Sequence, residues 1–433
     1  MLYHSTNNPA HRVALKQAVL RSLPPDNGLY MPDSLPVLDG NFWQTWRDLT
    51  FQEIGCSVAE ALFGEDVPAS ALREIVTGTL TFDAPLVTLE PGDHILELFH
   101  GPTLAFKDFG ARFMARLMAW LTRGEERELT VLVATSGDTG GAVASAFHHV
   151  PGTRVVILYP LGKVSGLQEK QLTALGGNIT ALEIDGSFDD CQALVKSVFL
   201  DHTLAEQLNL TSANSINLAR LVPQSFYYLH AARQLPQGVK PVFVVPSGNF
   251  GNLTAGLLAM KLGLPVAHFI AATNRNDVVP EFLRTGTYSP RPSVSTISNA
   301  MDVGAPSNFV RLLALCGGSW NNMQANITGK SFTDAQTRAA IREVKTLHDY
   351  VIDPHGAVGW LAARNWRAAH PCSTTITLET AHPAKFPDVM ATELGPNAVD
   401  IPDRLAILAN REKIATRLPA DLTIFRDWLL NSS

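Results

Sequence analysis

Cysteine is scarce in this sequence, and the few cysteines follow no pattern that would pair them or bind a metal. The four, Cys56, Cys191, Cys316 and Cys372, lie far apart and show no CxxC spacing. Neither a disulfide framework nor a zinc site is therefore indicated. The histidines also lack the spacing of metal ligands, so we predict no metal site. We expect the thiols to be reduced and buried.

The sequence also lacks a surplus of positive charge and a long apolar run. Its 34 Lys and Arg against 40 Asp and Glu give a formal net charge of −6, with no basic cluster. Nucleic-acid binding needs such clusters, so we exclude that partner and retain a small anionic ligand. No segment approaches the roughly 18 apolar residues of a membrane span, and no secretory signal is recognisable. We therefore expect a cytoplasmic protein that binds no membrane.

The apolar content is sufficient for a large core. With 433 residues, 46% of them hydrophobic, the chain is long enough for two or three domains. Residues 1–93 combine short helical patterns with proline-rich turns, which predicts a small N-terminal unit rather than a layer of sheet. From His94 onward, apolar runs alternate with amphipathic stretches, which is typical of an α/β fold with mainly parallel sheets covered by helices. The candidate strands are ILELF, LTVLVAT, RVVILYP, NITALEI, PVFVVPS, HFIAAT and TTITLET.

Two longer segments carry local signals of their own. In KDFGARFMARLMAWL an apolar residue recurs every four positions, at Phe109, Phe113, Leu117 and Leu121, which predicts a helix with one buried stripe. Residues 284–309 are rich in Pro, Ser and Gly, which predicts a long surface excursion able to close over a site.

Two glycine-rich loops each follow a candidate strand and precede a candidate helix. They are TSGDTGG at residues 135–141 and SGNFGN at residues 247–252. Backbone N–H groups at the start of a helix bind anions, so either loop could hold a phosphate or a carboxylate. An ordinary tight turn between strand and helix is the alternative for each. Because parallel sheets bind ligands at the carboxyl ends of their strands, we expect both loops to face one cleft.

Lys107 stands at the start of the apolar helix, between Phe106 and Phe109. Apolar surroundings lower the pKa of a lysine, which can then act as a nucleophile or a base near neutral pH. A solvated surface lysine is the alternative, because lysine is rarely buried.

Five segments, taken together and in order, resemble the threonine synthase family of fold-type II pyridoxal-phosphate enzymes. They are HGPTLAFKDFG, SGDTGGAV, SANSIN, PSGNFGN and TAHPAKF, spread over nearly 300 residues. The resemblance implies mainly parallel sheets covered by helices in two domains, plus the small N-terminal unit of residues 1–93. The large cofactor domain would comprise residues 94–127 and 221–433, and the small substrate-binding domain residues 128–220.

The resemblance also implies the cofactor, pyridoxal 5'-phosphate, and its ligands. Lys107 would bind it covalently, with Phe106 beside the ring and Thr380 at the pyridine nitrogen. Asp138 would lie near the 3-oxygen of the cofactor, where related enzymes often carry Asn, so its contact is open. The ligands of the cofactor phosphate would be Gly248, Asn249, Phe250, Gly251 and Asn252.

Two groups of substrate ligands are implied in the same way. Thr135, Ser136 and Thr139 would receive the substrate carboxylate and part of its phosphate. A second group would hold the substrate phosphate, and its arginine is always charged and able to bond two oxygens. This group comprises Asn214, Ser215 and Arg220.

Three polar side chains in these motifs also have ordinary structural alternatives. Thr380 could be a strand threonine, and Asn214 could be a helix cap. Lys385, in the last motif, is expected at the surface and is not assigned to the site.

The activity implied is conversion of O-phospho-L-homoserine and water to L-threonine and phosphate by γ-elimination and β-addition, the last step of threonine biosynthesis. Lys107 would take the α-proton of the substrate. The alternative is a phospho-lyase of the same fold that releases a 2-keto acid. A non-catalytic pyridoxal-phosphate protein is disfavoured by the intact Lys107 and Arg220. The partner is thus a small molecule, and the enzyme would be a monomer or a homodimer.

Overall fold

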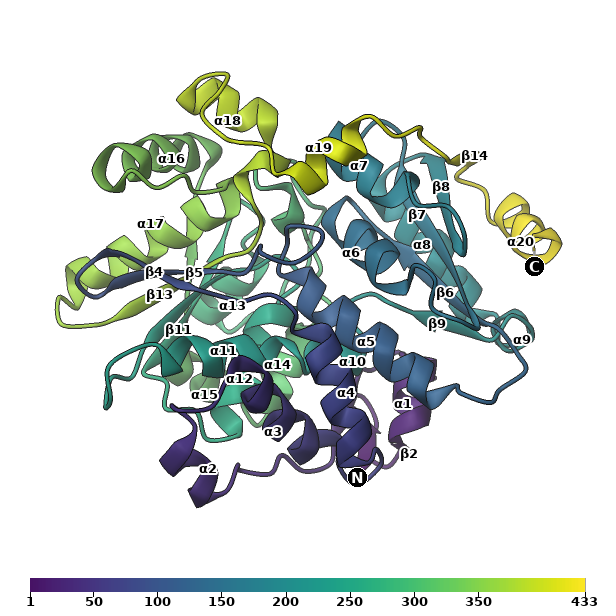
Figure 1. The fold of residues 1–433 in the computed structure, drawn as a ribbon, viewed down its shortest axis with the longest axis horizontal. Coiled ribbons are helices and arrows are strands. Elements are labelled where there is room, and N and C mark those ends of the chain that lie inside the picture. Colours follow the sequence, from purple (N-terminus) through teal and green to yellow (C-terminus); the bar gives the residue numbers. More distant parts are fainter. Residues whose placement is uncertain (433) are drawn as a thin grey trace.

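The computed structural model describes residues 1–432 apart from the side chains of His202 and Ala409. Two sheets lie side by side with helices packed around them (Figure 1). In the six-stranded sheet all neighbours are parallel except the last pair, which forms an antiparallel edge. Its spatial order is β12 (Ile327–Ser331), β11 (His268–Thr273), β10 (Val242–Pro246), β13 (Thr375–Glu379), β5 (Asp93–Glu97) and β4 (Leu86–Glu90).

The second sheet has five strands, all parallel. Every residue of its central strand is buried, because helices cover both faces and the strand reads as one apolar run. All the apolar runs predicted as strands form strands, and the predicted α/β fold is confirmed. The spatial order is β14 (Thr416–Pro419), β8 (Ile179–Asp185), β7 (Thr153–Pro160), β6 (Leu129–Ala134) and β9 (Leu210–Ser212).

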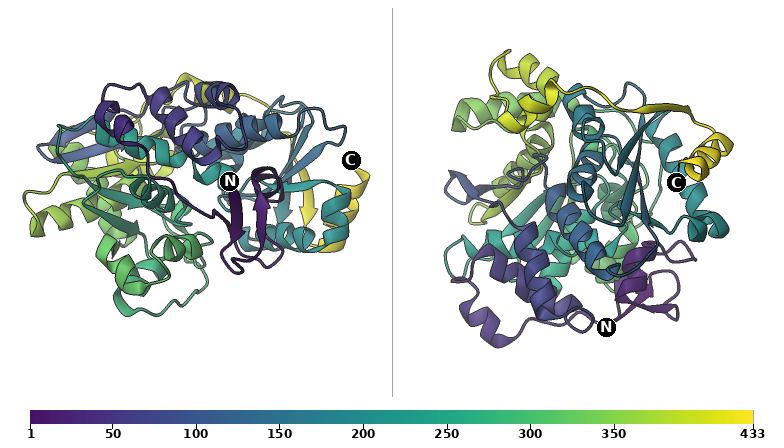
Figure 2. Two further views of the ribbon diagram at one scale, coloured as in Figure 1. Left: turned by 90° about the horizontal axis from the view of Figure 1, so that it is seen from below. Right: turned by 45° about the vertical axis from the view of Figure 1, so that its right-hand side comes forward.

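The N-terminal region contains a small antiparallel sheet, contrary to the prediction from sequence. Its strands, in spatial order, are β2 (Arg12–Ala14), β1 (Leu2–Ser5) and β3 (Tyr30–Pro32). They are too short to show an alternation of apolar and polar residues, which is why the pattern did not reveal them. Figure 2 shows these purple strands beside the five-stranded sheet, where the following helix packs against β9. The helices of this region are α1 (Leu15–Arg21), α2 (Gly40–Thr45), α3 (Phe51–Phe63) and α4 (Ala69–Thr79).

The remaining helices surround the two large sheets. The predicted stripe of Phe109, Phe113, Leu117 and Leu121 is buried in α5, which is thereby confirmed. The helices are α5 (Lys107–Leu121), α6 (Asp138–Phe147), α7 (Gly166–Thr173), α8 (Phe188–Leu200), α9 (His202–Gln207), α10 (Leu218–Leu221), α11 (Gln224–Arg233), α12 (Gly251–Lys261), α13 (Val278–Thr285), α14 (Phe309–Leu315), α15 (Trp320–Asn326), α16 (Asp334–His348), α17 (Pro354–Ala369), α18 (Pro387–Leu394), α19 (Asp403–Ala409) and α20 (Leu422–Asn431). Short 3-10 helices span η1 (Asn299–Met301) and η2 (Pro383–Lys385).

Two strands lie across the domain boundaries expected from sequence. β4 falls within residues 1–93 but pairs with β5 in the six-stranded sheet. β14 falls within residues 221–433 but pairs with β8. The yellow C-terminal segment therefore returns to the five-stranded sheet (Figure 1). Strand pairing, a long-range event, therefore divides the chain differently from its linear order.

Two further expectations from sequence concern the burial of the cysteines and the presence of membrane-spanning helices. All four cysteines are free; Cys56, Cys191 and Cys316 are buried, but Cys372 is exposed, which corrects the expectation of burial for that residue. Within residues 1–432 no helix is both long and apolar enough to cross a membrane.

Candidate active site

A cavity of about 300 Å³ lies at the carboxyl ends of β6, β10 and β13. This is the edge at which open parallel sheets bind ligands. Every residue that the sequence assigned to the site lines this cavity, although five separate segments supply them. They are Phe106, Lys107, Thr135, Ser136, Asp138, Thr139, Asn214, Ser215, Arg220, Gly248, Asn249, Phe250, Gly251, Asn252 and Thr380.

Lys107 is the first residue of α5 and points its amine into the cavity. Its Nζ lies 3.4 Å from Oδ2 of Asp138 and 4.9 Å from the centre of the Phe106 ring. Burial lowers the pKa of Lys107, and the positive charges of Lys385 and Arg220 add to that effect, while Asp138 opposes it. The side chain therefore has the property that a nucleophilic amine needs.

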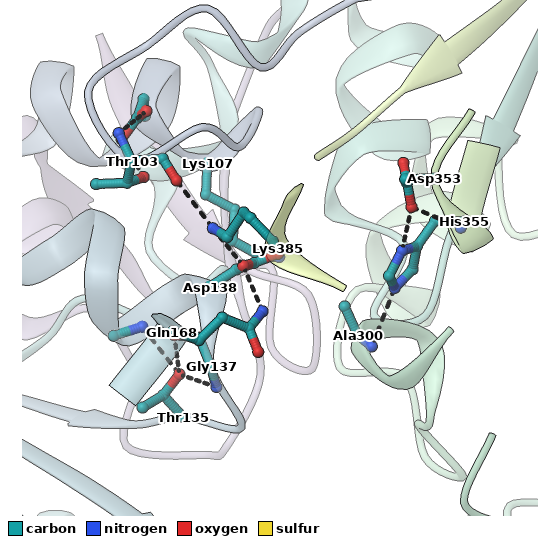
Figure 3. Close-up of polar contacts among 12 residues, drawn as sticks. Thr103, Lys107, Thr135, Gly137, Asp138, Gln168, Ala300, Asp353, His355 and Lys385 are labelled. Carbon is teal, nitrogen blue, oxygen red and sulfur yellow. Dashed lines mark hydrogen bonds and ion pairs between the residues drawn. The ribbon is translucent and has the colours of Figure 1, made fainter. Parts of the chain in front are cut away.

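Lys385 is not at the surface, contrary to the expectation from sequence. Its side chain is fully buried, and its Nζ lies 2.6 Å from Oδ1 of Asp138. The amine also donates to the carbonyl oxygen of Thr103 at 2.9 Å, and Gln168 donates to Oδ1 of Asp138 at 2.8 Å (Figure 3). Although burial raises the pKa of Asp138, the charges of Lys385 and Lys107 lower it well below its usual range. Asp138 is thus a buried anion held between two lysines.

The loop of residues 135–141 is shaped from within by Thr135. Its Oγ1 accepts hydrogen bonds from the backbone N–H groups of Gly137 and Gly140, at 3.0 and 2.9 Å, and donates to the Gly137 carbonyl oxygen at 3.1 Å. Gly137 has a φ of 144°, which an L side chain rarely adopts. If the Thr135 hydroxyl contacted the substrate, one of these three hydrogen bonds would have to break. Ser136 and Thr139, in the same loop, also line the cavity.

The loop of residues 247–252 ends at the first turn of α12, whose N-terminus lines the cavity. Asn252 fixes this loop, because its side chain accepts from Ser247 Oγ at 2.6 Å and donates to the Pro246 carbonyl oxygen at 2.8 Å. Phe250 adopts a left-handed conformation with a φ of 60°. The turn and the N–H groups at the helix start have the arrangement that anion sites use, and the anion-binding role stays a prediction.

Arg220 is a buried cation that lines the cavity. It is 3% exposed, and its Nη1 donates to the carbonyl oxygen of Ala213 at 2.6 Å. Its Nε has no hydrogen-bond partner, and no carboxylate among residues 1–432 forms an ion pair with it. Burial lowers the pKa of Arg220 to about 10. A buried guanidinium with unused donors is costly unless an anion binds there.

Comparisons with known proteins fit this geometry. Residues 84–376 match the family model of the pyridoxal-phosphate dependent enzymes. Residues 2–80 match the threonine synthase N terminus, and residues 356–428 match the threonine synthase C-terminal model. Threonine synthase of Escherichia coli K12 is 44% identical over 434 residues, covering 100% of both chains. The chain belongs to the threonine synthase family.

Other threonine synthases show the same full-length likeness. The Serratia marcescens protein is 43% identical over 99% of both chains. The crystal structure of the Escherichia coli threonine synthase superposes with a TM-score of 0.94 at 43% identity, and covers 100% of both chains. The pyridoxal-phosphate-bound threonine synthase of Brucella melitensis gives a TM-score of 0.93 at 35% identity, covering 100% of this chain and 99% of the other. The chain is therefore a pyridoxal-phosphate-dependent threonine synthase by family, a lyase of fold type II.

The side chains of the cavity suit the cofactor of this family. Lys107 offers an amine with a lowered pKa to the cofactor aldehyde, and the start of α12 offers N–H groups to its phosphate. Thr380 directly follows β13 and lines the cavity, where its hydroxyl would meet the ring nitrogen. The residues present therefore fit pyridoxal phosphate at its aldehyde, its phosphate and its ring nitrogen.

His355 lines the same cavity and was not assigned from sequence. Its Nδ1 lies 2.6 Å from Oδ1 of Asp353, and its Nε2 accepts from the backbone N–H of Ala300 at 3.2 Å (Figure 3). The accepted bond places the ring proton on Nδ1, facing Asp353. This dyad anchors η1 at the cavity wall, a role that only tertiary structure reveals.

Among the described residues no group of three or more His, Cys, Asp or Glu could hold a metal ion.

The predicted excursion of residues 284–309 overlaps the end of α13 and the start of α14, and residues 286–308 between these helices contain no strand and only the short η1 helix. Its residues Arg291–Ser293 and 299–305 line the cavity, so the predicted surface excursion does border the site. Asp302 holds it in place by accepting from Thr296 Oγ1 at 2.7 Å and from Asn274 Nδ2 at 2.8 Å.

The fit of this segment against Gly248 gives a testable stability effect. A Cβ at Gly248 would lie 2.6 Å from the Cα of Met301, so Gly248→Ala forces two backbone segments apart. We expect the variant apoprotein to lose about 1–3 kcal/mol of unfolding free energy. The matched control is Gly251→Ala, whose Cβ would meet Ser215 Cβ at an ordinary 3.4 Å. Urea unfolding of both variants without cofactor checks this, and equal losses would contradict it.

Proposed function

We propose that the cavity binds O-phospho-L-homoserine and that the residues around it convert this substrate and water to L-threonine and phosphate. The observation that supports the assignment is a lysine, 15% exposed and with a lowered pKa, in one cavity with two groups of anion-binding donors. One group is the α12 loop, suited to the cofactor phosphate, and the other includes Arg220, suited to the substrate phosphate. A third group, the loop of residues 135–141, also lines the cavity and suits the substrate carboxylate.

The ligands proposed for the substrate phosphate have hydrogen-bonding capacity to spare. Ser215 Oγ accepts from Asn249 Nδ2 at 2.7 Å and from Asn308 Nδ2 at 3.2 Å, so its own proton is left to donate to an anion. Asn214 donates one N–H to the carbonyl oxygen of Ala134 at 3.1 Å and keeps the second. Together with Arg220 they supply charge and directed donors where the leaving phosphate would develop charge.

The chemistry then divides between the cofactor and the chain. Pyridoxal phosphate, when bound, delocalises the negative charge that develops on the substrate α-carbon. Lys107 would take the α-proton as an unprotonated amine and later return a proton to that carbon. Once a β-proton has also been removed, the bond between the γ-carbon and the phosphate breaks while Arg220, Ser215 and Asn214 hold the phosphate. Water then adds at the β-carbon. The loop of residues 135–141 binds the substrate carboxylate through Ser136 and Thr139.

A product assay tests the function directly. Purified holoenzyme given O-phospho-L-homoserine should form L-threonine and phosphate in equal amounts. A phospho-lyase of the same fold would instead release phosphate together with a 2-keto acid. Phosphate release with keto acid and without threonine would therefore reject the proposal in favour of that alternative.

The proposed ligands also predict closure of the cleft. The carboxylate and phosphate ligands come from residues 128–220, whereas Lys107, the α12 loop and Thr380 come from outside that range. We expect an analogue bearing carboxylate and phosphonate to draw the two parts together, because only differential contacts shift such an equilibrium. Closure would exclude bulk water and leave one positioned water for the β-carbon.

Small-angle scattering and crystal structures with and without the phosphonate analogue measure this closure. The control is an analogue that keeps the carboxylate and lacks the phosphonate, for which a smaller change is expected. An unchanged interdomain angle with the phosphonate analogue fully bound would refute closure.

The proposal also covers the domain division, the oligomeric state and the location in the cell. The division into an N-terminal unit, a large cofactor domain and a small substrate domain of residues 128–220 is retained with two changes. β4 is added to the large domain because it pairs with β5, and β14 is added to the small domain because it pairs with β8. A monomer or homodimer is proposed, and sedimentation equilibrium would distinguish them. A cytoplasmic location is supported by the bacterial relatives and is tested by cell fractionation.

A further inference from the structure

The feature with no assigned role in this site is the buried lysine that follows β13. Lys385 ends η2 and is fully buried, although it does not line the cavity itself. Its Nζ is closer to Asp138 than the amine of Lys107 is, with contacts of 2.6 Å and 3.4 Å to the two carboxylate oxygens. Burying a lysine is costly unless it is paired and hydrogen-bonded, and here a carboxylate and the carbonyl oxygen of Thr103 meet both needs.

Each charged or polar group that faces Lys107 or Asp138 comes from an element described above. Lys107 faces Asp138 from α6, Lys385 from η2 and Arg220 from α10. Asp138 faces the same two lysines and the uncharged Gln168 of α7. A second buried carboxylate, Asp108, accepts from Thr103 Oγ1 at 2.6 Å and from the Thr103 N–H at 2.8 Å, and it faces Lys385, Arg112 and Arg220.

This arrangement decides whether Lys107 can work as a free amine. An anion beside a buried amine stabilises the ammonium form, so Asp138 alone would keep Lys107 protonated and unreactive. Because its contact with Asp138 is the shorter one, Lys385 offsets more of the carboxylate charge than Lys107 does. The positive charge of Lys385 also acts directly on Lys107 and lowers its pKa.

We propose that Lys385 is a positioning residue that neutralises and orients Asp138, so that Lys107 can react as an unprotonated amine. The assignment rests on the proposed role of Lys107 as the cofactor-binding lysine. Lys385 acts through Asp138, which lines the cavity, and its bond to the Thr103 carbonyl oxygen ties the pair to the turn that precedes α5.

The test follows the reaction of the apoprotein with pyridoxal phosphate, measured by absorbance over a range of pH. The rate of condensation rises with the fraction of unprotonated Lys107, so its pH midpoint reports that amine. Lys385→Gln removes the charge and keeps a donor for Asp138 or Thr103. We expect its midpoint to rise by about one pH unit, which slows condensation about tenfold at neutral pH.

A charge-balanced control separates electrostatics from structural damage. In Lys385→Gln combined with Asp138→Asn both charges are absent, and we expect the midpoint to return to within about half a pH unit of the wild type. Thermal unfolding of each apoprotein shows that it is folded. If the single variant does not fold, the double variant decides, because a midpoint shifted by more than about one unit would overturn the cancellation of charges.

Two other outcomes overturn the proposal. They are an unchanged midpoint in folded Lys385→Gln, and a double variant that remains as slow as the single one. Failure of the proposed function is distinguishable, since it would appear in the wild type as cofactor attached at a lysine other than Lys107 or as an absence of threonine formation.

Discussion

Replacing Lys107 with alanine will abolish threonine formation, with a loss of about 10³-fold or more in kcat, and will remove the absorbance of the lysine-bound cofactor. Alanine offers neither an amine for the cofactor aldehyde nor a base for the α-proton. The fold should survive, because the change removes a buried amine whose charged form is disfavoured by burial. Steady-state kinetics and absorbance spectra of the variant measure both effects.

The control for this prediction is a lysine outside the cavity. Lys196 lies on the exposed face of α8, and Lys196→Ala changes the net charge equally. It should retain full activity and the wild-type spectrum. Borohydride reduction of the wild type followed by peptide mapping should place the cofactor on Lys107. A label on Lys385, whose amine is also close to Asp138, would show that the two lysines have been assigned the wrong way round.

Replacing Arg220 with alanine will weaken binding of O-phospho-L-homoserine by about 2–5 kcal/mol, the usual cost of truncating one side of a buried charge pair. The cofactor spectrum should stay as in the wild type, because the cofactor phosphate is assigned to the α12 loop. Substrate titration followed by absorbance gives the dissociation constant. Arg220→Met, which fills more of the buried volume, should show the same loss if charge rather than packing is responsible.

The control is Arg291, an arginine that lines the same cavity and is already paired with Asp277 and Glu281. Because its charge is neutralised by two carboxylates, Arg291→Ala should weaken substrate binding much less than Arg220→Ala. A larger loss in Arg291→Ala, or loss of cofactor from Arg220→Ala without a change in substrate affinity, would show that the phosphate sites are assigned wrongly.

The membership of the cavity was accessible from sequence because its residues occur in short, contiguous motifs. The two glycine loops carry their geometry locally, through Gly137 with its positive φ and the turn before α12. The two loops follow strands of different sheets, β6 and β10, so the packing of one sheet beside the other brings them to one cavity. The sequence did not show which hydrogen bonds each side chain makes within its loop. Thr135 and Asn252 are occupied by bonds within their own loops, which depend on the folded backbone.

The sequence by itself determined the α/β alternation, the apolar stripe of α5 and the resemblance to a family, because each depends on a pattern of residues that are neighbours in the chain. Tertiary structure alone decided the burial of Lys385 beside Asp138 and the anchoring of Ala300 by His355. It also decided the return of β14 to β8, which are more than 200 residues apart in the chain. The physical reason is common to all of these. The charge state, exposure and pairing of a group depend on what long-range packing places next to it, and periodicity carries no information about such neighbours.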